Sequence, residues 1–371
     1  MVRAFRLKRN QPRVLILEPI GNLWGSEQSL LEFASTAADL RIAIYYPKES
    51  EFAVEVARLP TAAFPFFERD LHRRSKVRRI VACGRLLATA LWFRPTVIHA
   101  NQVGAVRYAQ AVGRALGISV TTHVRFHEDV EYLSALGGKT HSISKIICIS
   151  EYIQGLFKST KTLSAKTVCL YNAYRPKANW RRRVPMDYPP TFACVGRFEK
   201  NKRQDLLLEA MSVLRRRGNL SRVIFYGRGR NGDSIDGQLK KMSERLGLKE
   251  STVWAGFHRN VVNLIGGCCA QVCPFECEGL GRVIFEAWDA GTIPIVWAGS
   301  GGPAELITKS GAGIVYAEQT AECLAKSLHE ATLLSKNGRS ALIRQGRRWL
   351  RANCDPENYA HSLASIWNGV K

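Results

Sequence analysis

The sequence predicts an α/β protein of two domains, each built on a doubly wound parallel sheet. Its 371 residues are more than a single hydrophobic core usually supports. Short apolar runs rich in Val and Ile alternate with helical segments, and this alternation occurs twice along the chain. Residues 174–190 are rich in Arg and Pro and have no clear period, which is typical of a linker.

The apolar runs and the helical periods between them give the expected order of elements. In the first half we expect strands at 13–17, 41–46, 96–100, 119–123 and 145–149, and helices at 27–37, 76–92, 103–116 and 150–156. In the second half we expect strands at 191–195, 221–226, 253–255, 270–274 and 293–297, and helices at 203–217, 236–246 and 281–290. The predicted domains are therefore residues 1–175 and 176–354, and we expect a last helix at about 355–371 to pack back on the first domain. Two such sheets place a ligand-binding cleft between the domains, at the carboxyl ends of the strands.

Charge is the unusual feature of the composition. The formal net charge is +23, which predicts attraction to nucleic acid, to a phospholipid surface or to a phosphorylated substrate. The hydrophobic fraction of 46% and the charged fraction of 23% are ordinary for a soluble globular protein. Many basic residues gather in two short stretches: Arg73, Arg74, Lys76, Arg78, Arg79 and Arg85, and Arg175, Lys177, Arg181, Arg182 and Arg183.

The cysteines and the apolar stretches of the first hundred residues indicate the cellular compartment. Ten cysteines without regular pairing intervals are typical of reduced residues in a cytosolic protein. Cys268, Cys269, Cys273 and Cys277 are close in sequence, but their spacing fits no common zinc pattern and we expect core residues rather than a metal site. The apolar stretch 14–17 stops at Glu18, too short for a signal segment, and window 81–93 carries Arg85 and is too short for a membrane span. We expect a cytoplasmic protein, soluble or peripheral on the membrane.

The most informative segment is CPFECEGLGRVIFEAWDAGTIPIVWAGSGGPAE, residues 273–305. It predicts a strand, a loop with Glu278, and a helix whose first amides belong to Gly281, Arg282 and Val283. Gly279 and Gly281 allow a ligand to approach the main chain, and the helix N-terminus favours a phosphate. Carboxylates at Glu278 and Glu286 accept hydrogen bonds from sugar hydroxyls. The pattern therefore favours a ligand with both hydroxyls and a diphosphate.

The spacing of Glu278 and Glu286, with Gly301, Gly302 and Glu305 following, resembles the donor-binding signature of the retaining GT-B glycosyltransferases of family GT4. The resemblance implies the GT-B architecture, two Rossmann-like domains facing each other across a cleft. It also implies that Glu278 contacts the donor sugar and Glu286 the ribose hydroxyls. The donor site implied by this segment comprises Gly279, Leu280, Gly281, Arg282 and Val283 besides the two acids.

A second match opens the C-terminal domain. Gly196 follows a predicted strand, Arg197 supplies a planar fork for phosphate oxygens, and Lys202 adds a point charge. This segment resembles the GR…K segment of the family, whose cations hold the diphosphate. The resemblance therefore implies catalytic roles for Arg197 and Lys202 beside Glu278.

Weaker matches extend the resemblance over nearly the whole chain. Gly227, in Gly-Arg-Gly after a predicted strand, resembles the GxG loop of the family, and Gly25 resembles the glycine-rich loop of its N-terminal domain, with Trp24 in place of the first glycine.

His123 stands where relatives have a histidine near the transferred sugar, and Arg125 could face an acceptor phosphate. A hydrogen-bonded histidine at a strand end is the structural alternative for His123, and for His99 we favour that alternative. Asn172 stands at the hinge position, with Ala173 in place of the usual glycine.

The resemblance implies transfer of a sugar from a UDP- or GDP-sugar to a hydroxyl of a glycan or lipid-linked acceptor, with retention at the anomeric carbon. We expect no cofactor and no metal, because cations and helix amides can stabilise the leaving diphosphate and the sequence offers no convincing Asp-x-Asp motif. The basic stretch before the apolar helix at 80–93 would suit an anionic membrane surface, and hence a bacterial surface polysaccharide built on a lipid carrier. A solvated basic face over a core helix is the alternative interpretation.

Two other functions remain as alternatives. A nucleotide-sugar epimerase and a phosphorylase share the architecture. The phosphorylase needs a pyridoxal-binding lysine, for which no segment stands out. A basic nucleic-acid-binding protein would need aromatic residues interleaved with its cations, and the basic clusters lack them. We therefore expect no nucleic-acid partner.

Overall fold

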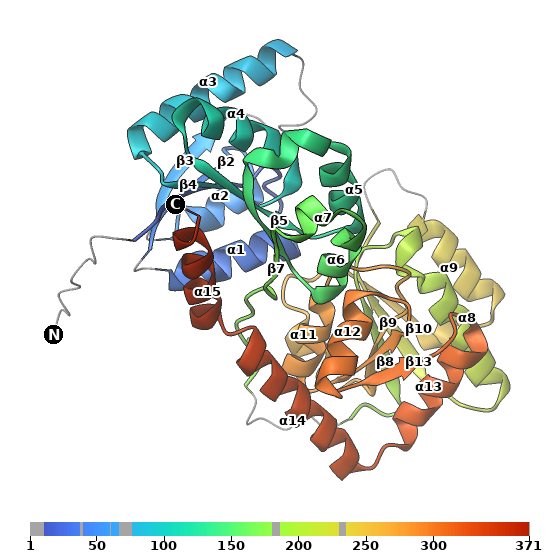
Figure 1. Ribbon diagram of the computed structural model, residues 1–371. Coiled ribbons are helices and arrows are strands. Elements are labelled where there is room, and N and C mark those ends of the chain that lie inside the picture. Colours follow the sequence, from blue (N-terminus) through green and yellow to red (C-terminus); the bar gives the residue numbers. More distant parts are fainter. Residues whose placement is uncertain are drawn as a thin grey trace. The chain divides into compact units, whose positions relative to one another are not determined.

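The computed structural model describes residues 11–37, 40–59, 61–66, 76–179, 186–229 and 235–370 (Figure 1). The chain divides into two compact units. Unit 1 comprises residues 1–175 and 353–371, and unit 2 comprises residues 176–352. From the sequence we placed the divisions after residue 175 and near residue 355. The expected linker contains no helix or strand at its described residues, 174–179 and 186–190.

Unit 1 is built on a seven-stranded parallel sheet in the order β3-β2-β1-β4-β5-β6-β7. Its strands are β1 Arg13–Leu17, β2 Arg41–Pro47, β3 Ala62–Phe66, β4 Val97–Ala100, β5 Ser119–Val124, β6 Ile143–Cys148 and β7 Thr167–Cys169. The central strands are buried almost without interruption, because helices cover both faces of a doubly wound sheet. The strand order reverses between β1 and β4, which makes their carboxyl ends the switch point of this sheet.

Helices of unit 1 pack by apolar stripes. They are α1 Gly25–Thr36, α2 Glu51–Val56, α3 Lys76–Phe93, α4 Val106–Leu116, α5 His127–Ala135, α6 Glu151–Gly155, α7 Lys161–Ser164 and α15 Pro356–Asn368. In α1, Leu30, Phe33 and Ala34 are buried at helical spacing. The last helix, α15, belongs to this unit and brings Trp367, 0% exposed, against Phe33 with ring centroids 5.8 Å apart.

Unit 2 repeats the plan with a six-stranded parallel sheet in the order β10-β9-β8-β11-β12-β13. Its strands are β8 Thr191–Val195, β9 Arg222–Tyr226, β10 Thr252–Gly256, β11 Ala270–Cys273, β12 Ile293–Trp297 and β13 Ile314–Tyr316. Its helices are α8 Gln204–Arg216, α9 Ile235–Arg245, α10 Val262–Ile265, α11 Arg282–Ala290, α12 Gly302–Ser310, α13 Ala321–Leu333 and α14 Lys336–Asn353. The order reverses between β8 and β11, so this sheet has its switch point there.

Apolar layers lie on both faces of the second sheet. On one face α8 and α13 pack against Phe192, Phe225 and Ile295 of the strands. On the other face Ile265 and Ala290 pack against Val195. Cys269 and Cys268 belong to these two layers, and burial raises the pKa of the Cys268 thiol to about 12. Among the residues that the structure describes, no group of His, Cys, Asp and Glu has the arrangement of a metal site.

Two α/β units with doubly wound parallel sheets are thus confirmed. The cleft between them stays a prediction. The elements that pattern reading missed are β3, β7, β13 and several helices. No helix in the described ranges has both the length and the apolar character needed to cross a bilayer.

Candidate functional site

The switch point of unit 2 gathers most of the predicted donor residues. The loop after β8 carries Gly196, Arg197 and Lys202, and the loop after the neighbouring β11 carries Glu278. Carboxyl ends of adjacent parallel strands open at the same edge of the sheet, and ligands of open α/β sheets bind where the strand order reverses. The two strongest sequence motifs therefore meet at one position of the fold.

Lys202 and Glu278 are in direct contact. The Nζ atom of Lys202 donates a hydrogen bond to Oε2 of Glu278. The same ammonium lies 4.2 Å from the centroid of the Phe275 ring. The side chains of Lys202 and Glu278 are only 12% and 19% exposed, so their charges interact with little solvent screening. Contacts with a carboxylate and an aromatic face hold the ammonium in one place.

Arg197 is held by a neighbour to which we had given no role. Its Nη1 lies 2.9 Å from Oε1 of Glu199, and Gln204 donates a hydrogen bond of 2.9 Å to its backbone oxygen. The Arg197 side chain is 37% exposed, whereas that of Glu199 is 18% exposed. A guanidinium has five N–H donors in a planar fork, a geometry that matches phosphate oxygens.

Gly196 and Gly227 bring the ends of β8 and β9 unusually close. Their φ angles are 153° and 157°, a region that favours glycine. A Cβ atom on Gly227 would lie 1.8 Å from the Gly196 oxygen. A Cβ atom on Gly196 would meet only Cζ of Phe275, at 3.7 Å. Gly227 is thus required for packing, whereas the face of Gly196 leaves room for a ligand.

Two loops fix the start of helix α11. Glu278 N donates to Ser300 O at 3.0 Å, and Gly302 N donates to Glu278 O at 2.9 Å. A Cβ atom on Gly302 would lie 2.5 Å from the Gly279 oxygen, so only glycine allows this approach. Gly281 caps α11 with a φ of 82°. These contacts determine where the helix N-terminus, which attracts anions, is placed.

The remaining residues of the predicted donor segment differ in exposure. Arg282, Val283 and Glu286 are half-buried, so their side chains reach the surface of the unit. Leu280 is 2% exposed. Its side chain anchors the loop in the core, and a contact with a donor would have to come from its main chain.

In unit 1 a buried polar network lies at the switch point between β1 and β4. Asn101 donates a hydrogen bond of 2.6 Å to Oε2 of Glu18 and accepts one of 2.7 Å at Oδ1 from Nη2 of Arg125. Nη1 of Arg125 donates to Oδ1 of Asn172 at 3.1 Å. Arg125 is only 3% exposed. Its guanidinium donates hydrogen bonds inside the unit, and its predicted contact with an acceptor stays a prediction.

His123 lies in the same interior. Its Nδ1 is 2.7 Å from Nε2 of His99, and its Nε2 is 3.0 Å from the hydroxyl of Tyr359 in α15. Burial, together with Arg125, lowers the pKa of His99 to about 3 and that of His123 well below its usual value. His123 is 2% exposed with both ring nitrogens engaged. This placement favours a positioning role over direct contact with a sugar.

Gly25 begins α1 beside a pair of buried acids. Gln102 donates to Oε1 of Glu18 at 3.0 Å and to Oε1 of Glu27 at 2.7 Å, while Trp24 N donates to the second oxygen of Glu27 at 3.0 Å. Burial, reinforced by the charge of Glu27, raises the pKa of Glu18 to about 8. Burial also raises the pKa of Glu27. The loop of Gly25 is therefore held by carboxyl groups inside the unit.

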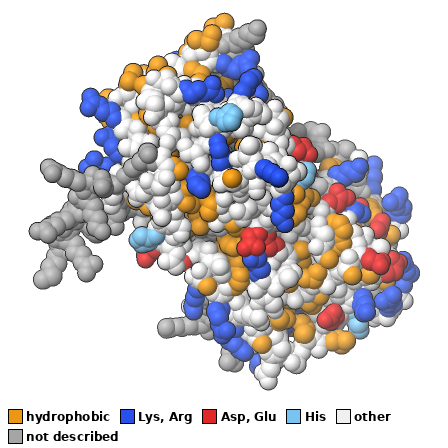
Figure 2. Space-filling model, viewed as in Figure 1, with side chains coloured by type: hydrophobic (Ala, Val, Ile, Leu, Met, Phe, Trp, Pro, Cys, Tyr) orange, Lys and Arg blue, Asp and Glu red, His pale blue; other side chains and the backbone are white. Residues whose placement is uncertain are grey.

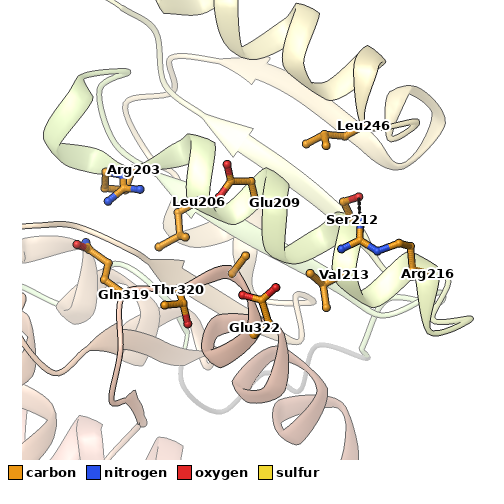
Figure 3. A pocket seen from close by; sticks show the side chains of 11 residues that line it. Arg203, Leu206, Glu209, Ser212, Val213, Arg216, Leu246, Gln319, Thr320 and Glu322 are labelled. Atoms are coloured by element: carbon orange, nitrogen blue, oxygen red, sulfur yellow. Dashed lines mark hydrogen bonds between the residues drawn. The ribbon is translucent and has the colours of Figure 1, made fainter.

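A groove of about 370 Å³ lies elsewhere on unit 2, beside helix α8 (Figure 3). Leu206 and Val213 of α8 lie on the side toward Thr320 and Glu322, and Ser212 lies on the side toward Leu246. The groove shares no residue with the predicted donor site. Arg203, at its edge, pairs with Glu276 through Nη1 and Oε1, 3.3 Å apart.

Comparison with known proteins identifies the second unit. Residues 177–349 match the family Glycosyl transferases group 1, and this range spans almost the whole of unit 2. The second unit belongs to the glycosyl transferases group 1. In this glycosyl transferase unit, Arg197, Lys202, Glu278 and Glu286 all lie inside the matched range.

Two bacterial glycosyltransferases are similar in sequence to part of the chain. The GDP-mannose-dependent alpha-(1-6)-phosphatidylinositol monomannoside mannosyltransferase of Mycobacterium tuberculosis is 25% identical over 52% of this chain and 51% of its own length. The lipopolysaccharide core biosynthesis glycosyltransferase LpsD of Rhizobium meliloti is 24% identical over 64% of each chain. The chain thus spans about half the length of the mannosyltransferase that it matches.

Solved structures share the fold of the whole chain. Anabaena HepE in complex with UDP-glucose superposes with a TM-score of 0.80 at 18% identity, over 96% of this chain and 99% of that one. A glycosyltransferase from Rickettsia africae gives 0.81 at 14% identity, over 97% and 99%. These neighbours share the GT-B fold, so the predicted fold class is confirmed.

Sequence reasoning missed several partners of the predicted site residues in each unit. Phe275 and Glu199 lie inside the motifs that we used, but an aromatic residue or a second acid in a loop has no distinctive pattern. Tyr359 lies 236 residues from its partner His123. Only the packing of α15 on unit 1 brings these two residues together.

Proposed function

We propose that the chain is a retaining glycosyltransferase that moves a sugar from a UDP- or GDP-sugar to a hydroxyl of a glycan or lipid-linked acceptor. The observation that carries the proposal is the contact between Lys202 and Glu278 at the switch point of unit 2. It pairs a phosphate-binding cation with a carboxylate suited to sugar hydroxyls. The family match of this unit and the activities for which the relatives are named support the same reaction class.

Each donor residue has a physical role in this proposal. Arg197, Lys202 and the first amides of α11 bind the diphosphate and stabilise the negative charge that it gains as the glycosidic bond breaks. Glu278 orients the donor sugar, and Glu286 accepts hydrogen bonds from the ribose hydroxyls. Gly196 and Gly279 let the main chain approach the ligand. The charge is stabilised by protein groups, so the proposal includes no metal and no cofactor.

The proposed acceptor is carried by a lipid. The mannosyltransferase relative is named for a phosphatidylinositol mannoside and LpsD for lipopolysaccharide core biosynthesis. A bacterial surface glycan built at the inner face of the cytoplasmic membrane would combine a soluble nucleotide sugar with such an acceptor. In unit 1, Arg125 and His123 hold the interior polar network in shape, beside the loop of Gly25.

Profiling a panel of UDP- and GDP-sugars tests the proposal. We expect a nucleoside diphosphate to be released from donors of one base. NMR of the product should show that the new glycosidic bond keeps the donor's anomeric configuration. Conversion of a donor to its epimer, without nucleotide release, would assign an epimerase instead. Release of nucleotide with inversion at the anomeric carbon would support a glycosyltransferase but would contradict the retaining mechanism.

A further inference from the structure

Helix α3 of unit 1 carries two apolar faces. Ala82, Leu86, Ala90 and Phe93, at intervals of four, four and three residues, are buried. On the opposite side Val77, Ile80 and Leu91 are 70%, 72% and 57% exposed. Val77 and Leu86 are nine residues apart, about two and a half helical turns, so their side chains point in opposite directions. The buried face explains how α3 packs in unit 1, and the exposed face has no such role.

The exposed side chains form one continuous stripe. Val77, Val81, Gly84, Ala88 and Leu91 recur at intervals of four and three residues, and all are exposed. Ile80 and Trp92, both 72% exposed, widen the stripe on its two sides. Scattered apolar residues are normal on a protein surface, but a continuous stripe along a helix marks a contact surface. We call this stripe with its flanking arginines the α3 surface.

The charge around the stripe has a single sign. Arg78 and Arg85 of α3 are exposed beside it, and Arg107 and Arg114 are exposed on α4, which packs against α3. The sequence contains no Asp or Glu between Asp70 and Glu128. In the space-filling view, apolar and basic side chains lie next to one another over the part of unit 1 that α3 occupies in Figure 1 (Figure 2). The basic residues Arg73 and Arg74 of the same predicted cluster lie outside the described residues.

We propose that the α3 surface docks unit 1 on an anionic phospholipid bilayer, with α3 lying in the plane of the membrane surface. A bilayer with acidic lipids offers phosphates to the arginines and hydrocarbon to the stripe in one layered surface. Trp92 lies at one end of the stripe, and tryptophan favours the interface between the two layers. A nucleic acid would satisfy the arginines but would leave Val77, Ile80 and Leu91 in water. The inference rests on the proposed function in one respect: docking on the membrane would bring the proposed transferase to its lipid-linked acceptor.

Two matched substitutions test the stripe. Ile80→Asp places a charge on it, and Val54→Asp places the same charge on α2, where Val54 is 58% exposed. We expect wild-type protein to bind vesicles of mixed phosphatidylglycerol and phosphatidylcholine at low salt. Removing one isoleucine from the apolar layer should lower the partition coefficient about tenfold to a hundredfold. Val54→Asp should change it by about twofold, since only one screened charge is added. Circular dichroism checks that both variants fold.

The arginines have a separate test. Arg85→Gln should lower the partition coefficient about fivefold, and Arg41→Gln, an exposed position on β2, should leave it nearly unchanged. Vesicles of phosphatidylcholine alone should bind weakly. Equal binding by Ile80→Asp and Val54→Asp would overturn the proposal. So would a wild type that ignores acidic vesicles but forms dimers that Ile80→Asp disrupts, since that outcome assigns the α3 surface to a second copy of the chain.

Nucleotide binding, measured without vesicles, separates the two proposals. If Ile80→Asp loses vesicle binding and keeps its affinity for UDP or GDP, both proposals stand. Absence of nucleotide binding in a wild type that still binds vesicles removes the proposed function and keeps the docking surface. Nucleotide binding in a wild type that does not bind vesicles removes the docking surface and keeps the proposed function.

Discussion

The ammonium of Lys202 and the carboxylate of Glu278 share a hydrogen bond that links the loop after β8 to the loop after β11. These strands are neighbours at the point where the order of the second sheet reverses. A comparable link occurs in the first sheet, where Asn101, after β4, donates to Glu18, after β1. Both units therefore use their switch point to hold polar side chains together, but the first unit buries them and the second leaves them partly exposed.

Exchange of the Glu278 carboxylate for an amide should affect catalysis. We expect Glu278→Gln to lower kcat about a hundredfold, as loss of a preorganised charge at the reacting sugar does. Glu276→Gln is the control, because Glu276 lies two residues away, is 43% exposed and pairs with Arg203 instead. Steady-state kinetics of nucleotide release measure both. Equal kcat values for the two variants would remove Glu278 from the catalytic site.

Two glycines in unit 2 should respond oppositely to alanine. Gly227→Ala places a methyl group 1.8 Å from the Gly196 oxygen and should lower the free energy of unfolding by about 3 kcal/mol or more. Gly237, in helix α9, has no atom within 4 Å of an added Cβ. Gly237→Ala should raise the free energy of unfolding by about 0.5 to 1 kcal/mol, because alanine favours the helix. Urea denaturation measures both values, and equal losses would show that the close approach of β8 and β9 does not constrain residue 227.

Glu18 should make stability depend on pH. Its pKa rises from 4.5 in the unfolded chain to about 8 in the folded one, through burial and the charge of Glu27. Between these values the folded state binds more protons, so the stabilisation is complete below pH 4.5 and is lost as the pH rises through 8. Glu18→Gln cannot ionise and should therefore gain stability relative to wild type as the pH rises through this window. Urea denaturation across the window measures the difference, and a constant difference would contradict the raised pKa.

The last helix should be essential to unit 1. Trp367 is 0% exposed, contacts Phe33 and His99, and donates a hydrogen bond of 3.2 Å to Thr121. Trp367→Ala should lower the free energy of unfolding by about 3 to 5 kcal/mol through the cavity that it leaves. Leu220→Ala, at a position 80% exposed, should cost almost nothing. Calorimetry compares the variants, and equal melting temperatures would mean that α15 contributes little to unit 1.

Pattern reading succeeded where the pattern is local. Strands such as β1 and β8 are continuous apolar runs, and their predicted bounds match the structure. The strand β3, AAFPF, was missed because it is short and contains a proline, and α14 was missed because most of its residues are polar. The α11 segment was predicted well, since its glycines and acids lie close together in sequence.

The placement of His123 and Arg125 could not be read from the sequence. Their partners, Tyr359 and Asn172, are 236 and 47 residues away. A histidine at a strand end has the same local pattern whether a ligand or a helix covers it. Burial by α15 depends on tertiary packing alone, and it changes the role that the ring can have.

Nucleotide affinity is the most direct test of the account, because it measures the diphosphate site without an acceptor. Titration calorimetry with UDP and GDP should show binding of at least one of them to the wild type. Lys202→Met should weaken that binding about tenfold or more, because a charge-assisted contact with phosphate is lost. Lys241→Met, which removes an exposed lysine from α9, should leave it unchanged. Equal affinities in all three proteins would contradict a diphosphate held by the loop after β8.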